Sequence, residues 1–238
     1  MDLGSSDLVP EGAPEHSGFE PDDGNEPGFT FTDKLPLMTD AESVTAESIR
    51  ALRAFLVAQH LQDGRRSLAI CAPSSGAGCS FLAANLAVGI AQSGISTLLI
   101  DANLRDPSID DYIRPSRQVI GLSECLREDT LSMGGVVCGV QPNLSVLYSG
   151  HIDDIARNEI GGHVFKSLLN SCLRDYDFTI IDTPAANRYA DAHQIAAAAH
   201  YALVVACRER TYVKDVRTLL DQLALARTTV LGTYLNDY

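Results

Sequence analysis

The sequence predicts an α/β fold, a three-layer sandwich in which a mostly parallel central sheet carries helices on both faces. Two observations lead to this prediction. Short apolar segments of strand length alternate with segments whose apolar residues recur at helical spacing, which is typical of a parallel sheet buried on both faces. The chain has 238 residues, 45% of them hydrophobic, which suffices for one domain with a full core.

The elements are expected in a regular order after residue 41. A first helix is indicated between 42 and 61, where apolar side chains recur at close to helical spacing, and Gly64 ends it. Strands are expected at the short apolar runs 67–71, 97–100, 144–147, 178–181, 202–206 and 230–235. Helices are expected between them at 81–92, 122–127, 164–174, 190–199 and 213–225.

The first part of the chain has a different composition. Residues 1–33 contain nine acidic residues and no lysine or arginine, together with four prolines and five glycines. Such a segment buries too little apolar surface to offset its ordering entropy. We therefore expect residues 1–40 to form a disordered acidic tail, either a solubilising leader or an interaction arm, and residues 41–238 to form the folded domain.

Charge and composition disfavour several classes of partner and site. The formal net charge is −13, of which −9 lies in residues 1–33, so nucleic acid and anionic lipid are not expected partners. No apolar run reaches the roughly 18 residues that span a bilayer. The six cysteines form no C-x-x-C pair, so neither a zinc site nor a disulfide framework is indicated. A reducing cytoplasm is the expected compartment.

Three features that suit phosphate and metal chemistry fall at the carboxyl ends of strands, where open α/β sheets bind ligands. The first is a glycine-containing turn between the strand at 67–71 and the next helix. Its glycines allow backbone N–H groups to converge on an anion, and the helix N-terminus adds its dipole. The turn includes Gly76, Ala77, Gly78, Cys79 and Ser80.

Asp101 and Asp182 are the second and third features, and each ends an apolar strand. Acidic residues at two strand ends beside a phosphate loop are a usual means of holding Mg²⁺ and its waters. The alternative is a tight turn with two helix-capping aspartates. Because the three features occur together and in this order, they favour a nucleotide site of the P-loop type.

These motifs resemble the cytoplasmic catalytic domain of the bacterial tyrosine kinases (BY-kinases), a P-loop family of capsule and exopolysaccharide synthesis that is related to partition-type and division-site ATPases. The resemblance covers about residues 42–237. Its motifs are Walker A at 76–80, D-x-D-x-R-x-P at 101–107, Walker B at 180–184 and the oligomerisation motif E-x-x-R-x-x-R at 47–53.

The resemblance implies ATP or ADP with Mg²⁺ as the cofactor. It assigns nucleotide binding to residues 76–81 and to Arg105, and it places Asn236 where related ATPases have an adenine-contacting asparagine. It assigns the metal to Ser80, Asp101 and Asp182.

The resemblance also implies partners. Glu47, Arg50 and Arg53 share one helix face and would form an oligomer interface, whose alternative is a solvated charged stripe. A membrane-anchored polysaccharide co-polymerase, or chain-length protein, would be the partner. Such a partner would hold a cytoplasmic chain peripherally at the inner membrane.

The chain departs from the family pattern at three positions. Cys79 replaces the lysine that neutralises the β- and γ-phosphates, Phe81 replaces a hydroxyl residue, and Asn103 replaces the second aspartate, a candidate base for the tyrosine proton. Because Cys79 precedes a helix, its thiol is expected to have a lowered pKa, and it is either redox-sensitive or a product of drift. ATP binding is therefore expected to be weakened or lost.

The phosphate-acceptor end is reduced as well. BY-kinases usually carry a tyrosine cluster in a C-terminal tail, but only Tyr234 and Tyr238 lie near the end of this sequence. Tyr234 is expected within the last strand. Tyr238 is either a remnant acceptor or an ordinary terminal residue.

Three functions compete. The combined losses favour a pseudokinase that regulates or assembles with a polysaccharide export protein. The alternative is an active ATP-dependent tyrosine autokinase or ATPase with another charge source, whose candidate catalytic residues are Asp101, Asn103 and Asp182. Arg105 is the nearest basic residue by motif, but it is no specific compensation, because the family already has an arginine there. A positioning ATPase of the partition class is disfavoured, because that class needs the loop lysine.

Overall fold

The computed structural model describes residues 28–127 and 138–237. The strands of its main sheet are β2 (Ser67–Cys71), β3 (Thr97–Asp101), β5 (Cys138–Gln141), β6 (Leu144–Leu147), β7 (Phe178–Asp182), β8 (Tyr201–Cys207) and β9 (Thr229–Asn236). Every residue of β2, β3 and β7 is buried. These strands read as continuous apolar runs because helices cover both of their faces.

Within the described residues the main sheet has seven strands in the order β5-β6-β3-β7-β2-β8-β9. All neighbours are parallel except β5, which runs antiparallel to β6 at the edge. The predicted α/β fold with a mostly parallel sheet is therefore confirmed. β2, β3 and β7 lie side by side, so their carboxyl ends meet at one place along the sheet edge.

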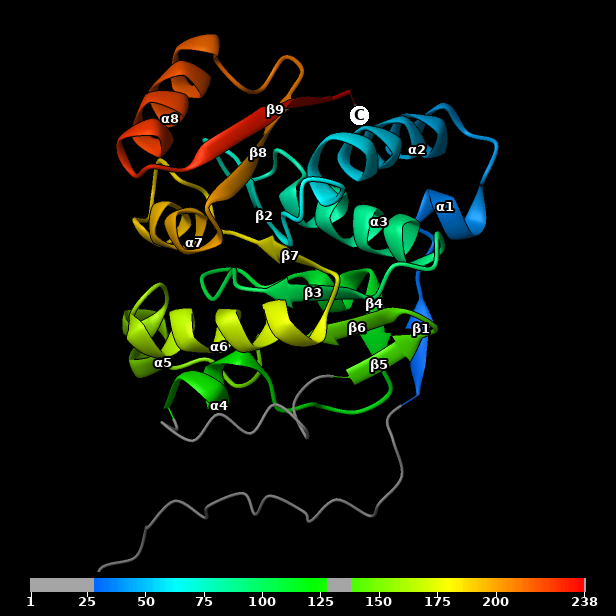
Figure 1. Ribbon diagram of the computed structural model, residues 1–238, viewed down its shortest axis with the longest axis horizontal. Coiled ribbons are helices and arrows are strands. Elements are labelled where there is room, and N and C mark those ends of the chain that lie inside the picture. The colour runs from blue at the N-terminus through cyan, green and yellow to red at the C-terminus, as the bar shows by residue number, and fades with distance from the viewer. Residues whose placement is uncertain (1–27, 128–137, 238) are drawn as a thin grey trace, which may run out of the picture.

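Helices form the two outer layers (Figure 1). One layer contains α1 (Pro36–Thr39), α2 (Val44–Leu56) and α3 (Cys79–Ala91). The other contains α4 (Leu122–Arg127), α5 (Asp154–Glu159), α6 (His163–Asp175), α7 (Asp191–Ala199) and α8 (Val213–Leu225). A π-helical turn, Val57–Leu61, continues α2. In the part of the chain that the structure describes, no helix has both the length and the apolar character needed to cross a bilayer.

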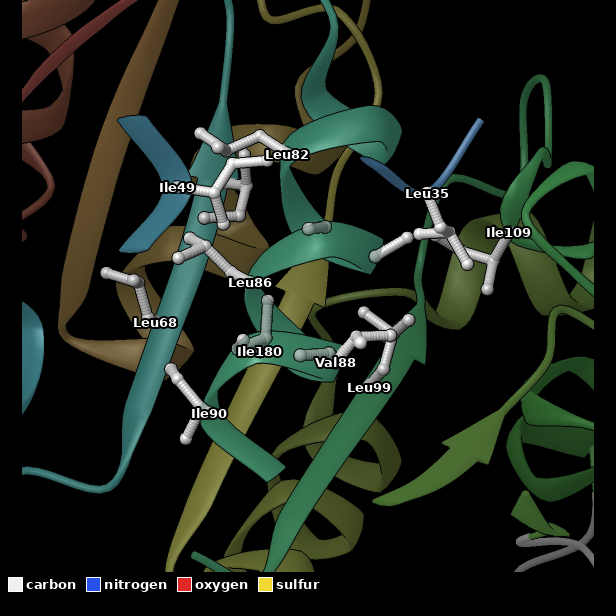
Figure 2. Close-up of a cluster of buried hydrophobic side chains, with 14 of the residues drawn as sticks. Leu35, Ile49, Leu68, Leu82, Leu86, Val88, Ile90, Leu99, Ile109 and Ile180 are labelled. Carbon is white, nitrogen blue, oxygen red and sulfur yellow. The ribbon is translucent and has the colours of Figure 1, made fainter. Parts of the chain in front are cut away.

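The helix that follows the phosphate loop is buried on all sides. Every residue of α3 from Leu82 to Ala91 is buried, because the helix lies between the sheet and α2. Figure 2 shows Leu86 and Ile90 of α3 among side chains from neighbouring strands, such as Ile180 of β7. This packing fixes the start of α3, and with it the loop that precedes the helix.

The predicted boundary at residue 41 is wrong for residues 28–40, which are ordered. β1 (Phe29–Phe31) pairs antiparallel with β4 (Ile113–Pro115), and the next residues bury Leu35 and Leu37 against the domain. Averaging the composition over an acidic segment hides these few apolar residues. Residues 1–27, where the rest of the predicted tail falls, lie outside the described residues.

Candidate functional site

The glycine-containing turn lies between β2 and α3 at the carboxyl edge of the sheet. Gly76 and Gly78 have φ angles of 76° and 98°, in the left-handed region that side chains disfavour. The turn lines a cavity of about 440 Å³ together with the loops after β3 and β7. All six predicted loop residues, 76–81, line this cavity, and their role in nucleotide binding stays a prediction.

Asp101 and Asp182 lie beneath the turn, as residue partners in the β3–β7 register. Both are buried. Asp182 Oδ2 accepts a hydrogen bond from Ser80 Oγ at 2.5 Å, whereas Asp182 Oδ1 is buried and has no hydrogen-bond partner among the described residues. The Asp101 carboxylate accepts hydrogen bonds from the backbone N–H groups of Asn103, at 3.2 Å, and Ile109, at 3.3 Å. The structure thus brings the three predicted metal ligands together.

Burial raises the pKa of both carboxyl groups. The pKa of Asp101 rises to about 7, although the backbone N–H groups of Ile109 and Asn103 oppose the shift. The pKa of Asp182 rises well above its usual range, mainly through burial and then through the charge of Asp101, against the hydrogen bond from Ser80. A bound cation would favour the ionised form of these two adjacent buried carboxyls, and Asp182 Oδ1 has no hydrogen-bond partner in the described residues. Their oxygens and the Ser80 hydroxyl are ligands that Mg²⁺ prefers, so these residues fit that ion.

Cys79 is the first residue of α3 and is half-buried. The prediction of a lowered thiol pKa is wrong in direction. Burial, followed by the charge of Asp182, raises the pKa of Cys79 well above its ordinary value. With its pKa raised, the group is a neutral thiol at pH 7. It brings neither the positive charge of a lysine nor a reactive thiolate.

Asn103 and Arg105 line the cavity, but both already have partners. Asn103 Nδ2 donates to Asp106 O at 2.6 Å, and Asn103 Oδ1 accepts from Asp106 N at 3.2 Å, so this side chain caps the turn after β3. Arg105 donates to both carboxylate oxygens of Asp191, at 2.8 and 3.2 Å, and lies 4.9 Å from the ring centre of Tyr189. The charge of Arg105 is therefore balanced within the protein.

Asn236 reaches the site from the end of β9. Its side chain is buried, and Nδ2 donates to the carbonyl oxygen of Ala77 at 3.1 Å. The residue predicted to contact a nucleotide thus holds the phosphate loop itself, and it fixes the loop to the last strand.

Two arginines beside the loop lie outside the sequence motifs. Arg188, in the segment after β7, lines the cavity. Arg210, in the segment after β8, has Nη1 4.0 Å from the position that a Cβ atom would take on Gly76. Both are exposed, and within the described residues neither side chain has a hydrogen bond or an ion pair. The sequence feature that could have identified each arginine is a basic residue a few positions after a strand that ends at this edge of the sheet.

The predicted oligomer face lies on α2. Arg50 pairs with Glu47 at 3.1 Å, and Arg50 Nη2 also donates to Ala41 O at 2.5 Å. Arg53 Nη1 donates to Gly89 O at 3.2 Å on α3. Both arginines therefore have partners inside the chain, and the interface stays a prediction.

Of the two tyrosines near the end of the sequence, the structure describes Tyr234. Tyr234 lies within β9, as expected, and its hydroxyl is 3.3 Å from Ser48 Oγ on α2. Tyr238 lies outside the described residues.

Comparison with known proteins identifies the family. No protein-family model matches the chain. The chain is 31% identical to the putative tyrosine-protein kinase CapB of Staphylococcus aureus over 195 residues, which is 82% of this chain and 85% of CapB. It is 30% identical to the succinoglycan biosynthesis transport protein ExoP of Rhizobium meliloti, over 84% of this chain and 26% of that longer protein.

A solved structure agrees with these relatives. The kinase domain of the Escherichia coli tyrosine kinase ETK superposes with a TM-score of 0.77 at 25% identity, covering 86% of this chain and 79% of that one. With this fold, this loop and these relatives, the chain belongs to the family of bacterial tyrosine-protein kinases.

Proposed function

We propose that the chain is a catalytically degenerate BY-kinase-type protein of capsule or exopolysaccharide synthesis, which binds a magnesium nucleotide and acts by assembly rather than by tyrosine phosphorylation. One observation carries the proposal. The phosphate loop keeps its left-handed glycines and lies above two buried carboxyls, but the residue at the lysine position is the neutral thiol of Cys79.

Nucleotide binding is supported by the parts of the site that remain. Gly76 and Gly78 give the turn the shape that lets backbone N–H groups face an anion. Ser80, Asp101 and Asp182 would hold Mg²⁺, which neutralises phosphate charge when it is bound. The cavity of about 440 Å³ is lined by Ser80 and by residues that follow the two aspartates closely in sequence, Asn103 and Thr183.

Phosphate transfer is opposed by what the site lacks. Losing one electrostatic contact to the transition state typically slows a reaction by about 10²–10³. Losing a general base slows it by roughly 10²–10⁴. Asn103, an amide engaged with Asp106, accepts no proton. A kinase that turns over about 1–100 times per second would therefore slow by roughly 10⁴–10⁷.

The proposed partner is a membrane-anchored polysaccharide co-polymerase, which would place a cytoplasmic chain at the inner membrane. The support is the name of one relative: ExoP is called a biosynthesis transport protein for succinoglycan. The chain spans only 26% of ExoP, so the remaining length of such relatives is available for a membrane part. In this proposal the α2 face with Glu47 and Arg50 contacts a neighbouring copy or the partner.

The test is radiolabel transfer from γ-labelled Mg-ATP to the purified full chain. We expect labelling no higher than in Asp182→Ala, which removes a metal ligand. Calorimetric titration of the same preparation with Mg-ATP and Mg-ADP should show binding. Labelling of the wild type that Asp182→Ala abolishes would refute the degenerate assignment.

The second candidate is an active tyrosine autokinase with another source of positive charge. Arg188 and Arg210 favour it, because both guanidinium groups lie beside the loop without an ion pair in the described part of the chain. The replacement of the base by Asn103 counts against it. The same labelling experiment separates the two candidates.

A further inference from the structure

We infer that Arg188 and Arg210 together replace the missing loop lysine, by contacting the phosphate groups of the nucleotide from the two loops that border the turn. The inference rests on the proposed function, since it concerns the nucleotide site of that proposal, and it names the residues that set affinity for phosphate there.

The site needs a positive charge that the turn does not supply. A nucleoside triphosphate carries about four negative charges, and Asp101 and Asp182 are already placed beneath the turn. Cys79, at the lysine position of the turn, has no cationic side chain. Arg105 is occupied by both carboxylate oxygens of Asp191. The side chains that could supply the charge are those that line the cavity or lie beside the turn.

Arg188 is held beside the turn by its backbone. The segment that carries it is joined to the residues that lead into the phosphate loop, since Ala186 N donates to Ala72 O at 3.0 Å and Asn187 N donates to Pro73 O at 2.9 Å. Its guanidinium lies 5.9 Å from the ring centre of Tyr189, and the residue lines the cavity. The backbone of Arg188 is therefore fixed beside the turn, and its exposed side chain lies at the cavity.

Arg210 approaches the same turn from the neighbouring strand. A tight turn fixes its backbone, because Arg210 N donates to Cys207 O at 3.2 Å and Cys207 N donates to Thr211 Oγ1 at 2.9 Å. Its Nη1 atom lies 4.0 Å from the Cβ position of Gly76. In the same turn Arg208 points elsewhere and pairs with Asp237 at 2.9 Å.

Ordinary surface arginines explain this arrangement less well. The chain has 31 acidic residues against 18 basic ones, so carboxylate partners are plentiful. Six other arginines pair with carboxylates, namely Arg50, Arg65, Arg105, Arg127, Arg157 and Arg208, whereas the exposed Arg217 on α8 has no ion pair among the described residues. Arg188 and Arg210 belong instead to two different loops that border one glycine turn, and neither has an ion pair in the described chain.

The arrangement defines what these residues do. A guanidinium offers a planar fork that matches two phosphate oxygens, which suits it to phosphate recognition. Because both arginines are exposed, their attraction to phosphate is screened by salt more strongly than that of a buried lysine. Affinity should therefore depend on the number of phosphates and on ionic strength, and should be largely insensitive to the base.

The experiment is calorimetric titration of the full chain with Mg-ATP, Mg-ADP and AMP at two salt concentrations. The variants are Arg188→Ala, Arg210→Ala, the double variant, and Arg217→Ala as a control, since Arg217 is exposed on α8 outside the cavity lining. Each site variant should lose about tenfold in affinity for Mg-ATP and the double variant about a hundredfold, as for a lost charge-assisted hydrogen bond. AMP binding and the control should change less than twofold.

A variant that regains affinity would show that the losses in the double variant come from missing charge and not from misfolding. Adding Cys79→Lys to the double variant should restore most of the affinity, because the lysine returns charge to the turn itself. Site variants that bind Mg-ATP within twofold of the wild type would overturn the inference and leave the proposed function standing. A wild type that binds no nucleotide up to millimolar concentration would overturn both. Rapid phosphate transfer by the wild type would refute only the degenerate assignment.

Discussion

Replacing Asp182 with asparagine should stabilise the metal-free chain at neutral and alkaline pH. Asp182 and Asp101 are adjacent in the β3–β7 register, both are buried, and Asp182 Oδ1 has no hydrogen-bond partner in the described residues. Asparagine has nearly the same shape and no charge. The substitution therefore removes a buried titrating group and leaves the packing around it in place.

The magnitude follows from proton linkage. The pKa of Asp101 is 3.8 in its reference state and about 7 in the folded chain. Between these values the folded chain keeps a proton that the unfolded chain has lost, so the free energy of unfolding falls as pH rises from about 4 to 7. Three pKa units correspond to at most about 4 kcal/mol for Asp101, at about 1.4 kcal/mol per unit. The raised pKa of Asp182 acts in the same direction.

Urea denaturation of wild type and Asp182→Asn at pH 5, 6.5 and 8 measures this effect. The stability advantage of the variant should grow from pH 5 to pH 8, because the raised pKa of Asp182 makes the wild type lose stability as pH rises and the variant lacks that group. His60, whose pKa is lowered by burial, loses its stabilising contribution as pH falls below 6.5, but equally in both proteins. Asp221→Asn, at an exposed position on α8, is the control and should show no such trend. A difference that stays constant with pH would refute the reasoning.

Further predictions concern the metal, the N-terminal strand, the turn and the thiol. Mg²⁺ at ten times its dissociation constant should stabilise the wild type at pH 8 by about 1.4 kcal/mol and leave Asp182→Asn unchanged in thermal melts. Leu35→Ala should lower the free energy of unfolding by about 2–5 kcal/mol, because Leu35 is fully buried; a loss near zero would mean that residues 28–40 do not belong to the fold. Gly78→Ala should cost about 1–2 kcal/mol in urea denaturation, since φ is 98° there, whereas Gly139→Ala, where a Cβ meets no atom within 4 Å, should cost less. At pH 8 Cys79 should react with a thiol reagent more slowly in the folded chain than in urea, because its pKa is raised; equal rates would contradict the neutral thiol.

The sequence predicts well those parts of the fold that are fixed by continuous burial. β2, β3 and β7 consist of apolar runs that are buried at every position, and each prediction came within one residue of the strand. β5 and the short helix α5 were not predicted, because their residues are mixed in polarity and their burial depends on contacts with distant segments. β1 was missed for the same reason, since its partner β4 is more than 80 residues away.

In the candidate site, too, features defined by neighbouring residues were predicted and contacts between distant segments were not. The turn and the two strand-end aspartates were predicted because each is defined by residues that are close in sequence. The direction of the Cys79 pKa was not, because the local helix dipole is opposed by burial and by Asp182, about a hundred residues away. The pairing of Arg105 with Asp191 and the approach of Arg210 to Gly76 likewise join segments that only the folded chain brings together.

We propose that the phosphate loop and the two buried aspartates bind nucleotide but lack the groups for phosphate transfer. Single-turnover transfer from labelled Mg-ATP, compared between wild type and the double variant Cys79→Lys/Asn103→Asp, tests it most directly. We expect calorimetric binding by both proteins, no labelled tyrosine in the wild type and labelled tyrosine in the double variant. Labelling of the wild type at a rate within tenfold of the double variant would contradict the claim.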